Sequence, residues 1–345
     1  MIPHSRPTFD QNDFDGALQV LKSGQIVQGK QTARFEENLS SLIGVRGGVA
    51  VSSGTAALHL ALISLGIGKG DEVILPSFVC TAPLNAIYYV GATPVIAEVD
   101  RFTFNVAVND LKKRITKKTK AVIVPHMFGL PADIADIVSL GVPIIEDCAH
   151  SIGSRYKDNY TGSFGVLSIF SFYATKVIAA GEGGMVLSDN EQLISIIRHL
   201  RDYDEKDDFA VRYNYKMTDI QAALGISQLK KLSLFIQKRK EIADKYGRIF
   251  DDLRIPAPFV PKGREHIYYR YVVLLENAQR FMDSMMKRRV ACRRPVFKPL
   301  HRYLGLPGYA TTDLVWERAV SIPIYPSLTD EEVGLITDSV KLALS

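Results

Sequence analysis

A regular alternation of short apolar segments and helical patterns between residues 48 and 188 most constrains what this chain can fold into. The apolar segments are strand-length, and residues with helical periodicity separate most of them. Predicted strands lie at 48–51, 72–75, 94–99, 121–125, 142–145, 166–172 and 185–188, and the helices between them at 56–65, 81–90, 108–114 and 133–140. Because strands that are apolar along their whole length are buried on both faces, the pattern predicts an α/β fold with a mostly parallel sheet covered by helices.

The chain has 345 residues, enough for one large domain and a smaller one. Helices predicted at 9–23 and 31–43 precede the alternation, and a long helix predicted at 219–253 follows it. Three prolines at 256, 258 and 261 then mark a linker. We predict an N-terminal segment with a large α/β domain at 1–253 and a small α+β domain at 254–345. The small domain is expected to contain a strand at 271–275, a helix at 278–289, an arginine-rich strand ending at 296 and a helix at 330–344.

Composition excludes several classes of protein. Hydrophobic residues make up 47% of the chain and the net charge is only +5, which does not fit a dedicated nucleic-acid binder. Cys80, Cys148 and Cys292 are too few and too scattered for a disulfide framework or a zinc site. The N-terminus lacks a signal-peptide pattern, and no apolar run is long enough to cross a bilayer. We expect a cytoplasmic protein without a metal, nucleic-acid or membrane partner.

Lys176 follows the predicted strand 166–172 and precedes a glycine cluster at 181–184. At the end of a buried strand, polar residues from different elements of an α/β sheet converge. A lysine among Phe, Tyr, Ala, Val and Ile is poorly hydrated, which favours the neutral, nucleophilic amine. The alternative is a surface lysine whose ammonium reaches water.

A small-residue turn around Gly54 and Thr55 joins the predicted strand 48–51 to the helix 56–65. Free N–H groups at a helix start, approached closely because of a glycine, form a cradle for phosphate. The alternative is a plain helix cap formed by Ser53 or Thr55.

Asp147 and His150 follow the predicted strand 142–145. A carboxylate there either caps a helix or holds a protonated ring nitrogen. Metal binding by Asp147 and His150 is discounted because no third ligand is near in sequence. A phosphate cradle, a carboxylate and a desolvated lysine together fit pyridoxal phosphate (PLP), whose aldehyde condenses with a lysine and whose ring nitrogen needs an acidic partner.

Several motifs extend this interpretation over nearly the whole chain. They are SGTAAL (53–58), GKGDEV (68–73), GATPV (91–95), EDCAH (146–150), SFYATK (171–176), GEGG (181–184), YKMTDIQAA (215–223) and PLH (299–301). In this order they resemble the DegT/DnrJ/EryC1/StrS family of PLP-dependent sugar aminotransferases. The resemblance implies PLP fold type I, the aspartate-aminotransferase type, and a homodimer.

The resemblance also implies residue roles. Lys176 would be the lysine that binds PLP and moves the proton, Asp147 would bind the pyridine nitrogen, and His150 the phenolic oxygen, where many relatives have Gln. Gly54, Thr55 and Ser171 would hold the phosphate. Asn214 would reach the phosphate of the neighbouring subunit, and the alternative for Asn214 is an exposed turn before the long helix.

One position departs from the family pattern. Many relatives place an aromatic residue on the pyridine face where this chain has Cys80. A thiol cannot supply that π contact, so we name Phe78 as a candidate to cover the ring.

The substrate is expected to be a nucleotide-linked keto sugar, with glutamate as the amino donor. Candidate substrate-binding residues are Arg293, Arg294, Lys298 and His301, together with the loop 25–31. Guanidinium groups suit a diphosphate, and the alternative is that the arginines cover an exposed strand. Relatives aminate C3 or C4, and we favour the C4 ketone of a 6-deoxyhexose. Alternatives are a C3-specific enzyme and a non-catalytic regulatory or scaffold protein of the same fold, against which the complete set Asp147, His150 and Lys176 argues.

Overall fold

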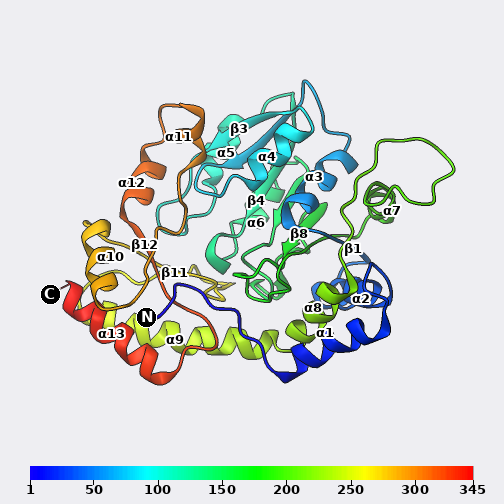
Figure 1. Ribbon diagram of the computed structural model, residues 1–345. Coiled ribbons are helices and arrows are strands. Elements are labelled where there is room, and N and C mark those ends of the chain that lie inside the picture. The colour runs from blue at the N-terminus through cyan, green and yellow to red at the C-terminus, as the bar shows by residue number, and fades with distance from the viewer. Residues whose placement is uncertain (345) are drawn as a thin grey trace.

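A seven-stranded sheet forms the centre of the larger unit in the computed structural model, which describes residues 1–344 (Figure 1). The strand order is β1-β9-β8-β5-β4-β2-β3. The sheet is parallel except for β9, which runs antiparallel to both of its neighbours. The strands are β1 (Gly47–Val51), β2 (Glu72–Pro76), β3 (Thr93–Ala97), β4 (Thr119–Pro125), β5 (Ile144–Asp147), β8 (Leu167–Ser171) and β9 (Gly184–Ser188). The expected α/β class and mostly parallel sheet are therefore confirmed.

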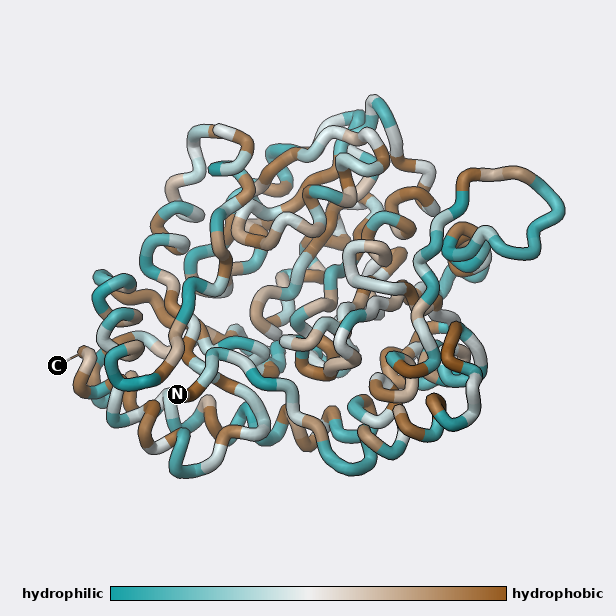
Figure 2. The backbone as a smooth tube through the Cα atoms, in the orientation of Figure 1, coloured by the Kyte–Doolittle hydropathy of each residue, from teal (hydrophilic) through white to brown (hydrophobic). Residues whose placement is uncertain are grey.

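Helices cover both faces of this sheet. One face packs against α3 (Gly54–Ser64), α4 (Ala82–Tyr89) and α7 (Glu191–Leu200). The other face packs against α2 (Lys30–Ile43), α5 (Val108–Arg114), α6 (Ile134–Val138) and α8 (Asp219–Lys230). Along β4, Val122 and Val124 belong to one apolar cluster and Ile123 to the other, as the alternation of side chains along a strand requires. In Figure 2, brown hydrophobic stretches recur along the segments at the centre of the molecule.

The N-terminal helices lie at the side of the large unit. Helix α1 (Gln11–Ser23) packs on α8, as α2 does. Asp219, the first residue of α8, is buried and accepts hydrogen bonds from the backbone N–H groups of Gly29 and Thr32. These bonds cap the start of α2, so Asp219 also fixes the end of the loop 25–31.

The C-terminal unit has its own apolar cluster, formed by β11 (Tyr271–Leu274), β12 (Ala319–Ile322), α10 (Ala278–Lys287) and α13 (Asp330–Leu344). The second half of α9 (Leu232–Asp252) contributes Tyr246 and Phe250 to this cluster. In Figure 1, α9 runs from α8 to α13 and so connects the two units. The boundary at residue 253 stays a prediction.

Helix α12 (Ala310–Arg318) ties the C-terminal unit to the sheet. The Glu98 carboxylate, just beyond β3, accepts hydrogen bonds from the N–H groups of Thr311 and Thr312 and from the Thr312 hydroxyl. The Tyr309 hydroxyl donates to the carbonyl of Ile96. Because the first turn of a helix has N–H groups without partners of its own, a carboxylate from the neighbouring unit is well placed there.

Two sequence expectations are corrected. The helix expected at 219–253 is two helices, because the chain departs from helical geometry at Lys231, with φ −96° and ψ 0°. The arginine-rich segment ending at Val296 is not a strand. It makes only two isolated bridges, a parallel one between Val290 and Ile2 and an antiparallel one between Arg293 and Ser321.

The remaining elements are short or lie away from the sheet. They are the 3-10 turn η1 (Met127–Gly129), helix α11 (Leu300–Leu304) and a small three-stranded sheet of β6 (Arg155–Tyr156), β7 (Asn159–Tyr160) and β10 (Arg264–Glu265). Among residues 1–344, no helix combines the length and the hydropathy that crossing a membrane requires.

Candidate active site

A cavity of about 460 Å³ opens where the carboxyl ends of five parallel strands meet. This is the edge at which open α/β sheets place their ligands. Segment 295–303 of the C-terminal unit closes the opposite side. The lining residues include Gly54, Thr55, Cys80, Asp147, His150, Ser171, Lys176, Glu182, Phe297, Lys298 and Tyr303.

The start of α3 forms one wall of the cavity. Ser53 caps the helix by accepting from the N–H of Ala56, so the plain-cap alternative is also realised here. Gly54 and Thr55 follow it in the first helical turn, whose N–H groups have no acceptor within the helix. A Cβ built on Gly54 would lie 3.0 Å from the Ser171 Cβ and 3.3 Å from its Oγ. The absence of a side chain at Gly54 therefore lets the helix start approach Ser171.

Asp147 ends β5 and points into the cavity from its floor. The N–H of Ala149 donates to Asp147 Oδ1 over 3.0 Å. Burial raises the pKa of the Asp147 carboxyl, and the opposing effects of the Ala149 N–H, Lys176 and His126 do not cancel this. A carboxyl that is desolvated in this way gains most from a cationic partner.

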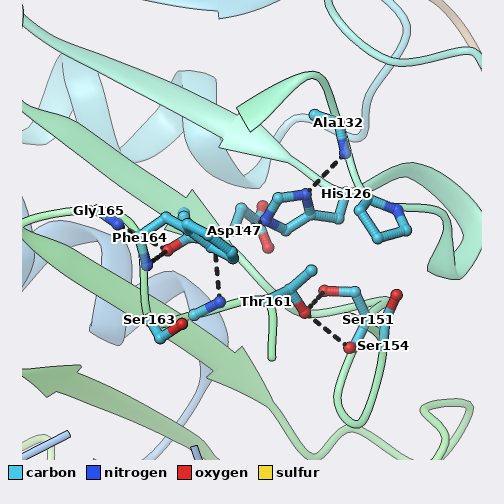
Figure 3. Close-up of polar contacts among 12 residues, drawn as sticks. His126, Ala132, Asp147, Ser151, Ser154, Thr161, Ser163, Phe164 and Gly165 are labelled. Atoms are coloured by element: carbon cyan, nitrogen blue, oxygen red, sulfur yellow. Dashed lines mark hydrogen bonds and ion pairs between the residues drawn. The ribbon is translucent and has the colours of Figure 1, made fainter. Parts of the chain in front are cut away.

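A buried network beneath the floor fixes this strand end (Figure 3). Glu146 accepts four hydrogen bonds, from the His126 ring and from the N–H groups of Gly162, Phe164 and Gly165. The N–H of Ala132 donates to His126 Nδ1, so the ring proton lies on Nε2 and points at Glu146. Glu146, His126 and Cys148 offer metal-ligating atoms close together, but both carboxylate oxygens and both ring nitrogens are already hydrogen-bonded.

His150 also lines the cavity and lies three residues beyond the end of β5. Its ring is nearly parallel to that of Tyr269, with 4.4 Å between centroids, and to that of Phe128, with 6.1 Å. Burial lowers the pKa of His150 well below its ordinary value, and the charges of Lys176 and Arg270 lower it further. The imidazole is therefore neutral at physiological pH and can act as a hydrogen-bonding group.

Lys176 reaches the cavity from the loop that follows β8. Its side chain is half-buried, and Nζ lies 5.3 Å from the centroid of the Tyr269 ring. Lys176 therefore lines the cavity and does not lie on the outer surface. The structure brings Lys176, Asp147, His150, Gly54, Thr55 and Ser171 into one cavity, as the sequence predicted.

These residues fit PLP by the chemistry of their groups. The helix start at Gly54 and Thr55, with Ser171 beside it, suits the phosphate. The desolvated Asp147 suits a protonated ring nitrogen, and the amine of Lys176 suits the aldehyde. Which atom of PLP each residue contacts stays a prediction.

Phe78 does not line the cavity, which corrects the expectation for this residue. Its side chain is fully buried and packs at 6.2 Å from both the Phe104 and the Phe128 rings. Cys80, two residues further, is exposed and lines the cavity instead. The apolar side chain is held in the core because it belongs to the cluster under α3 and α4.

Three of the four expected substrate-binding residues also lie outside the cavity lining. Arg293 is exposed next to its bridge with Ser321. Arg294 donates to the carbonyl oxygens of Trp316 and Glu317 at the end of α12, where the helix dipole favours a cation.

His301 is the third of these residues and is buried. It hydrogen-bonds Ser77 through Nδ1 over 2.7 Å and Asp313 through Nε2 over 3.0 Å. These bonds join α11 to the end of β2, so His301 has a structural role here. Only Lys298 of the four lines the cavity, with Nζ 4.6 Å from the Tyr303 ring centroid.

Three aromatic residues at or beside the cavity were not predicted from the sequence: Tyr269, Phe297 and Tyr303. Phe297 is 85% exposed at the mouth, although its carbonyl accepts from the Trp316 indole and fixes the backbone. An aromatic residue in a run such as HIYYRY (266–271) is indistinguishable by sequence from a buried strand residue.

Asn214 is exposed and does not line the cavity of its own chain. It lies between α7 and α8, five residues before the start of α8. The backbone on either side is fixed, because the N–H of Ser52 donates to the Tyr215 carbonyl and the N–H of Tyr213 to the Leu200 carbonyl. Its contact with a neighbouring subunit stays a prediction.

Comparison with known proteins identifies relatives of the whole chain. The model of the DegT/DnrJ/EryC1/StrS aminotransferase family matches residues 7–341. GDP-perosamine synthase of Escherichia coli O157:H7 is 35% identical over 359 residues, which cover 98% of this chain and 97% of the relative. The crystal structure of the aminotransferase TlmJ from Streptoalloteichus hindustanus superimposes with a TM-score of 0.96 at 29% identity, covering 100% and 99% of the two chains.

A further structure was solved in its PLP form. It is the putative sugar aminotransferase Spr1654 from Streptococcus pneumoniae, with a TM-score of 0.94 at 29% identity, covering 99% of this chain and 98% of that chain.

The raised pKa of Asp147 predicts a stability effect in the cofactor-free protein. Folding then binds a proton between the ordinary carboxyl pKa of 3.8 and the raised value, so stability falls as pH rises through that window. We expect Asp147→Asn to stabilise the cofactor-free protein at neutral pH by about 1 kcal/mol, since it removes a desolvated charge that its partners compensate only in part. The gain should shrink on acidification, and thermal unfolding against pH measures it.

Asp158→Asn, on the exposed turn between β6 and β7, is the matched control and should give no pH-dependent gain. A neutral-pH midpoint for Asp147→Asn equal to or below that of the native chain would contradict the assignment of Asp147 as a desolvated carboxylate that its partners compensate only in part.

Proposed function

The chain belongs to the DegT/DnrJ/EryC1/StrS aminotransferase family and is a PLP-dependent sugar aminotransferase, and from this premise we propose that it aminates a keto sugar carried on a nucleoside diphosphate. The observation that carries the proposal is that Lys176, Asp147 and His150 line one cavity with the start of α3. A non-catalytic member of the fold has no need to keep this set together.

The residues have separate tasks in this proposal. Bound PLP supplies an electron sink that stabilises negative charge at the carbon bearing the amino group. Asp147 keeps the ring nitrogen protonated through its carboxylate. Lys176 carries the proton on Nζ between the two carbons that lose and gain it. His150, neutral because it is buried, hydrogen-bonds the phenolic oxygen.

Lys298 is the proposed ligand of the substrate diphosphate. Among the described residues, Lys176 and Lys298 are the two lysines that line the cavity, and no arginine does. The contact of Lys298 with Tyr303 holds its ammonium group at the mouth of the cavity. Arg294, expected from the sequence for this task, is occupied by carbonyls of α12. The Escherichia coli relative is a GDP-perosamine synthase, which supports a nucleoside diphosphate as the carrier.

The position of amination and the donor belong to the proposal alone. We propose the C4 ketone of a 6-deoxyhexose and glutamate as the donor, with C3 amination as the alternative. The orientation of the sugar over Lys176 decides between them, and rim residues from segment 295–303 set that orientation.

We also propose a homodimer in which each subunit completes the other's site. The exposed Asn214, on a backbone held by hydrogen bonds to β1 and α7, is the residue expected to reach the partner's phosphate. In the segment before it, Phe209 is 96% exposed, and a partner subunit would cover this aromatic residue.

Lys176 provides the first test. Purified protein loaded with PLP should be yellow, and borohydride followed by peptide mass spectrometry should place the cofactor on Lys176. Lys176→Ala should lose transamination by at least about 10³-fold, because both the covalent attachment and the proton carrier are removed. Full turnover by a colourless Lys176→Ala protein contradicts the assignment, and Lys157→Ala, on an exposed turn, is the control.

Lys298 provides the second test, with a panel of nucleotide-linked 3-keto and 4-keto sugars. Lys298→Ala should raise the KM for the nucleotide sugar about threefold to tenfold with little change in kcat, as expected for one charge-assisted contact near solvent. Arg293→Ala, exposed and outside the cavity lining, should leave KM unchanged. An unchanged KM in Lys298→Ala removes the diphosphate role, and products aminated only at C3, read by NMR, reject the C4 proposal.

Shared sites can be tested by mixing two inactive variants. Asn214→Asp should block the partner's phosphate site by charge repulsion, and Lys176→Ala blocks its own site. A mixed dimer of the two then contains one site with both defects and one with neither, so mixing should restore activity. Light scattering at micromolar concentration should give a dimer. A monomer that still holds PLP, or a mixture that stays inactive, contradicts the proposal.

A further inference from the structure

Tyr269 links both functional side chains of the cavity wall although it belongs to the C-terminal part of the chain. It lies between β10 and β11 and is only 4% exposed. Its ring stacks on the His150 imidazole, with 4.4 Å between centroids and 24° between planes. The same ring has Lys176 Nζ 5.3 Å from its centroid. One aromatic ring therefore contacts two residues that come from different strands of the sheet.

The backbone around Tyr269 is held against the large unit. The N–H of Ile267 donates to the Gly129 carbonyl, and the N–H of Arg270 donates to the Phe128 carbonyl. Gly129 has a φ of +94°, and a Cβ built there would lie 3.1 Å from the Tyr269 N and 3.2 Å from the His150 O. Only glycine fits this turn, so η1 brings the Tyr269 segment close to the His150 backbone.

The hydroxyl of Tyr269 has partners of its own. It lies 3.4 Å from Thr175 Oγ1, next to Lys176, and Arg270 Nη2 donates to it over 3.3 Å. Arg239, from α9, donates to the Tyr269 carbonyl. Burial raises the pKa of the Tyr269 hydroxyl, but Arg270, Lys176, the Thr175 hydrogen bond and Arg239 outweigh it and lower the pKa to about 8.

The titratable groups of residues 1–344 that face Tyr269 are therefore either cationic or neutral, and none of them is anionic. Arg270 is on its own segment, Lys176 on the loop after β8, and Arg239 on α9, whereas the buried His150 is neutral. Behind them, Arg270 also contacts His4, whose pKa burial lowers to about 2, so that this ring is neutral as well.

We propose that Tyr269 is a positioning residue of the transamination, whose ring holds His150 and Lys176 in their working orientation and whose hydroxyl ties the Lys176 loop to Arg270. A flat ring between these side chains restricts both without entering the chemistry, since Tyr269 itself does not line the cavity. The C-terminal unit thereby contributes to the alignment of Lys176 as well as to the rim of the cavity.

Substitutions at Tyr269 separate the ring from the hydroxyl. Tyr269→Leu should lower kcat about tenfold to a hundredfold, with KM for the amino donor within about twofold, because alignment is lost while binding remains. Tyr269→Phe keeps the ring and should hold kcat within about threefold. Borohydride trapping of PLP on Lys176, followed by mass spectrometry, should be slowed in Tyr269→Leu and not in Tyr269→Phe.

Tyr268→Leu is the matched control, because Tyr268 stacks on His266 away from the cavity. A kcat loss of equal size in Tyr268→Leu, or in Tyr269→Phe, overturns the role of the ring, as does an unchanged kcat in Tyr269→Leu.

A second measurement uses the cofactor-free protein and does not depend on the Tyr269→Leu variant. In a near-ultraviolet pH titration of the cofactor-free protein, one tyrosine should ionise near pH 8, and Tyr269→Phe should remove that phase. Thr175→Val should move it to higher pH, since it removes a hydrogen bond that favours the phenolate. A titration in which Tyr269→Phe changes nothing in this range overturns the placement of the hydroxyl among the cations.

Discussion

The buried carboxylate of Glu146 is the interaction on which the rest of the site depends. Its four hydrogen bonds come from two separate parts of the chain. One comes from His126, in the turn after β4, and three come from the N–H groups of Gly162, Phe164 and Gly165, in the loop before β8. A fully buried carboxylate is tolerated only when its oxygens accept hydrogen bonds in this way. Because Asp147 is the next residue, the same bonds set the height and direction of the cavity floor.

The C-terminal unit is fastened to this frame at points that surround the cavity. Glu98 caps α12, Ser77 binds His301, and the Gly129 turn receives the segment before β11. Each contact joins the end of a sheet strand to the smaller unit. The second unit is thus held at the ends of β2, β3 and β4, on the same edge of the sheet as the ends of β5 and β8, which carry Asp147 and precede Lys176. Loosening these contacts should therefore change the alignment of the reacting groups as well as the stability.

Sequence alone predicted the parts of the protein that follow from local rules. The alternation of strands and helices fixes the sheet, and since parallel strands end at one edge, Gly54, Asp147 and Lys176 had to converge. Polar residues of the C-terminal unit could not be placed in this way. Arg294 and His301 looked like ligands, yet Trp316 and Ser77 satisfy them, and these partners are distant in sequence. Phe78 and Cys80 differ by two positions, and only the packing of the core decides which of them faces the cavity.

The charges around the cavity connect cofactor binding with the stability of the fold. In the cofactor-free protein, burial raises the pKa of Asp147 and lowers that of His150, so the site holds a carboxyl that resists ionisation beside an imidazole that resists protonation. Both pKa shifts arise because the two groups are removed from water and their protein partners replace the lost hydration only in part. A ligand with a cationic ring nitrogen and an anionic phosphate would restore the missing partners at Asp147 and at the start of α3. Ligand binding then stabilises the groups whose burial is least favourable in the cofactor-free fold. This links the affinity for the cofactor to the stability of the whole chain.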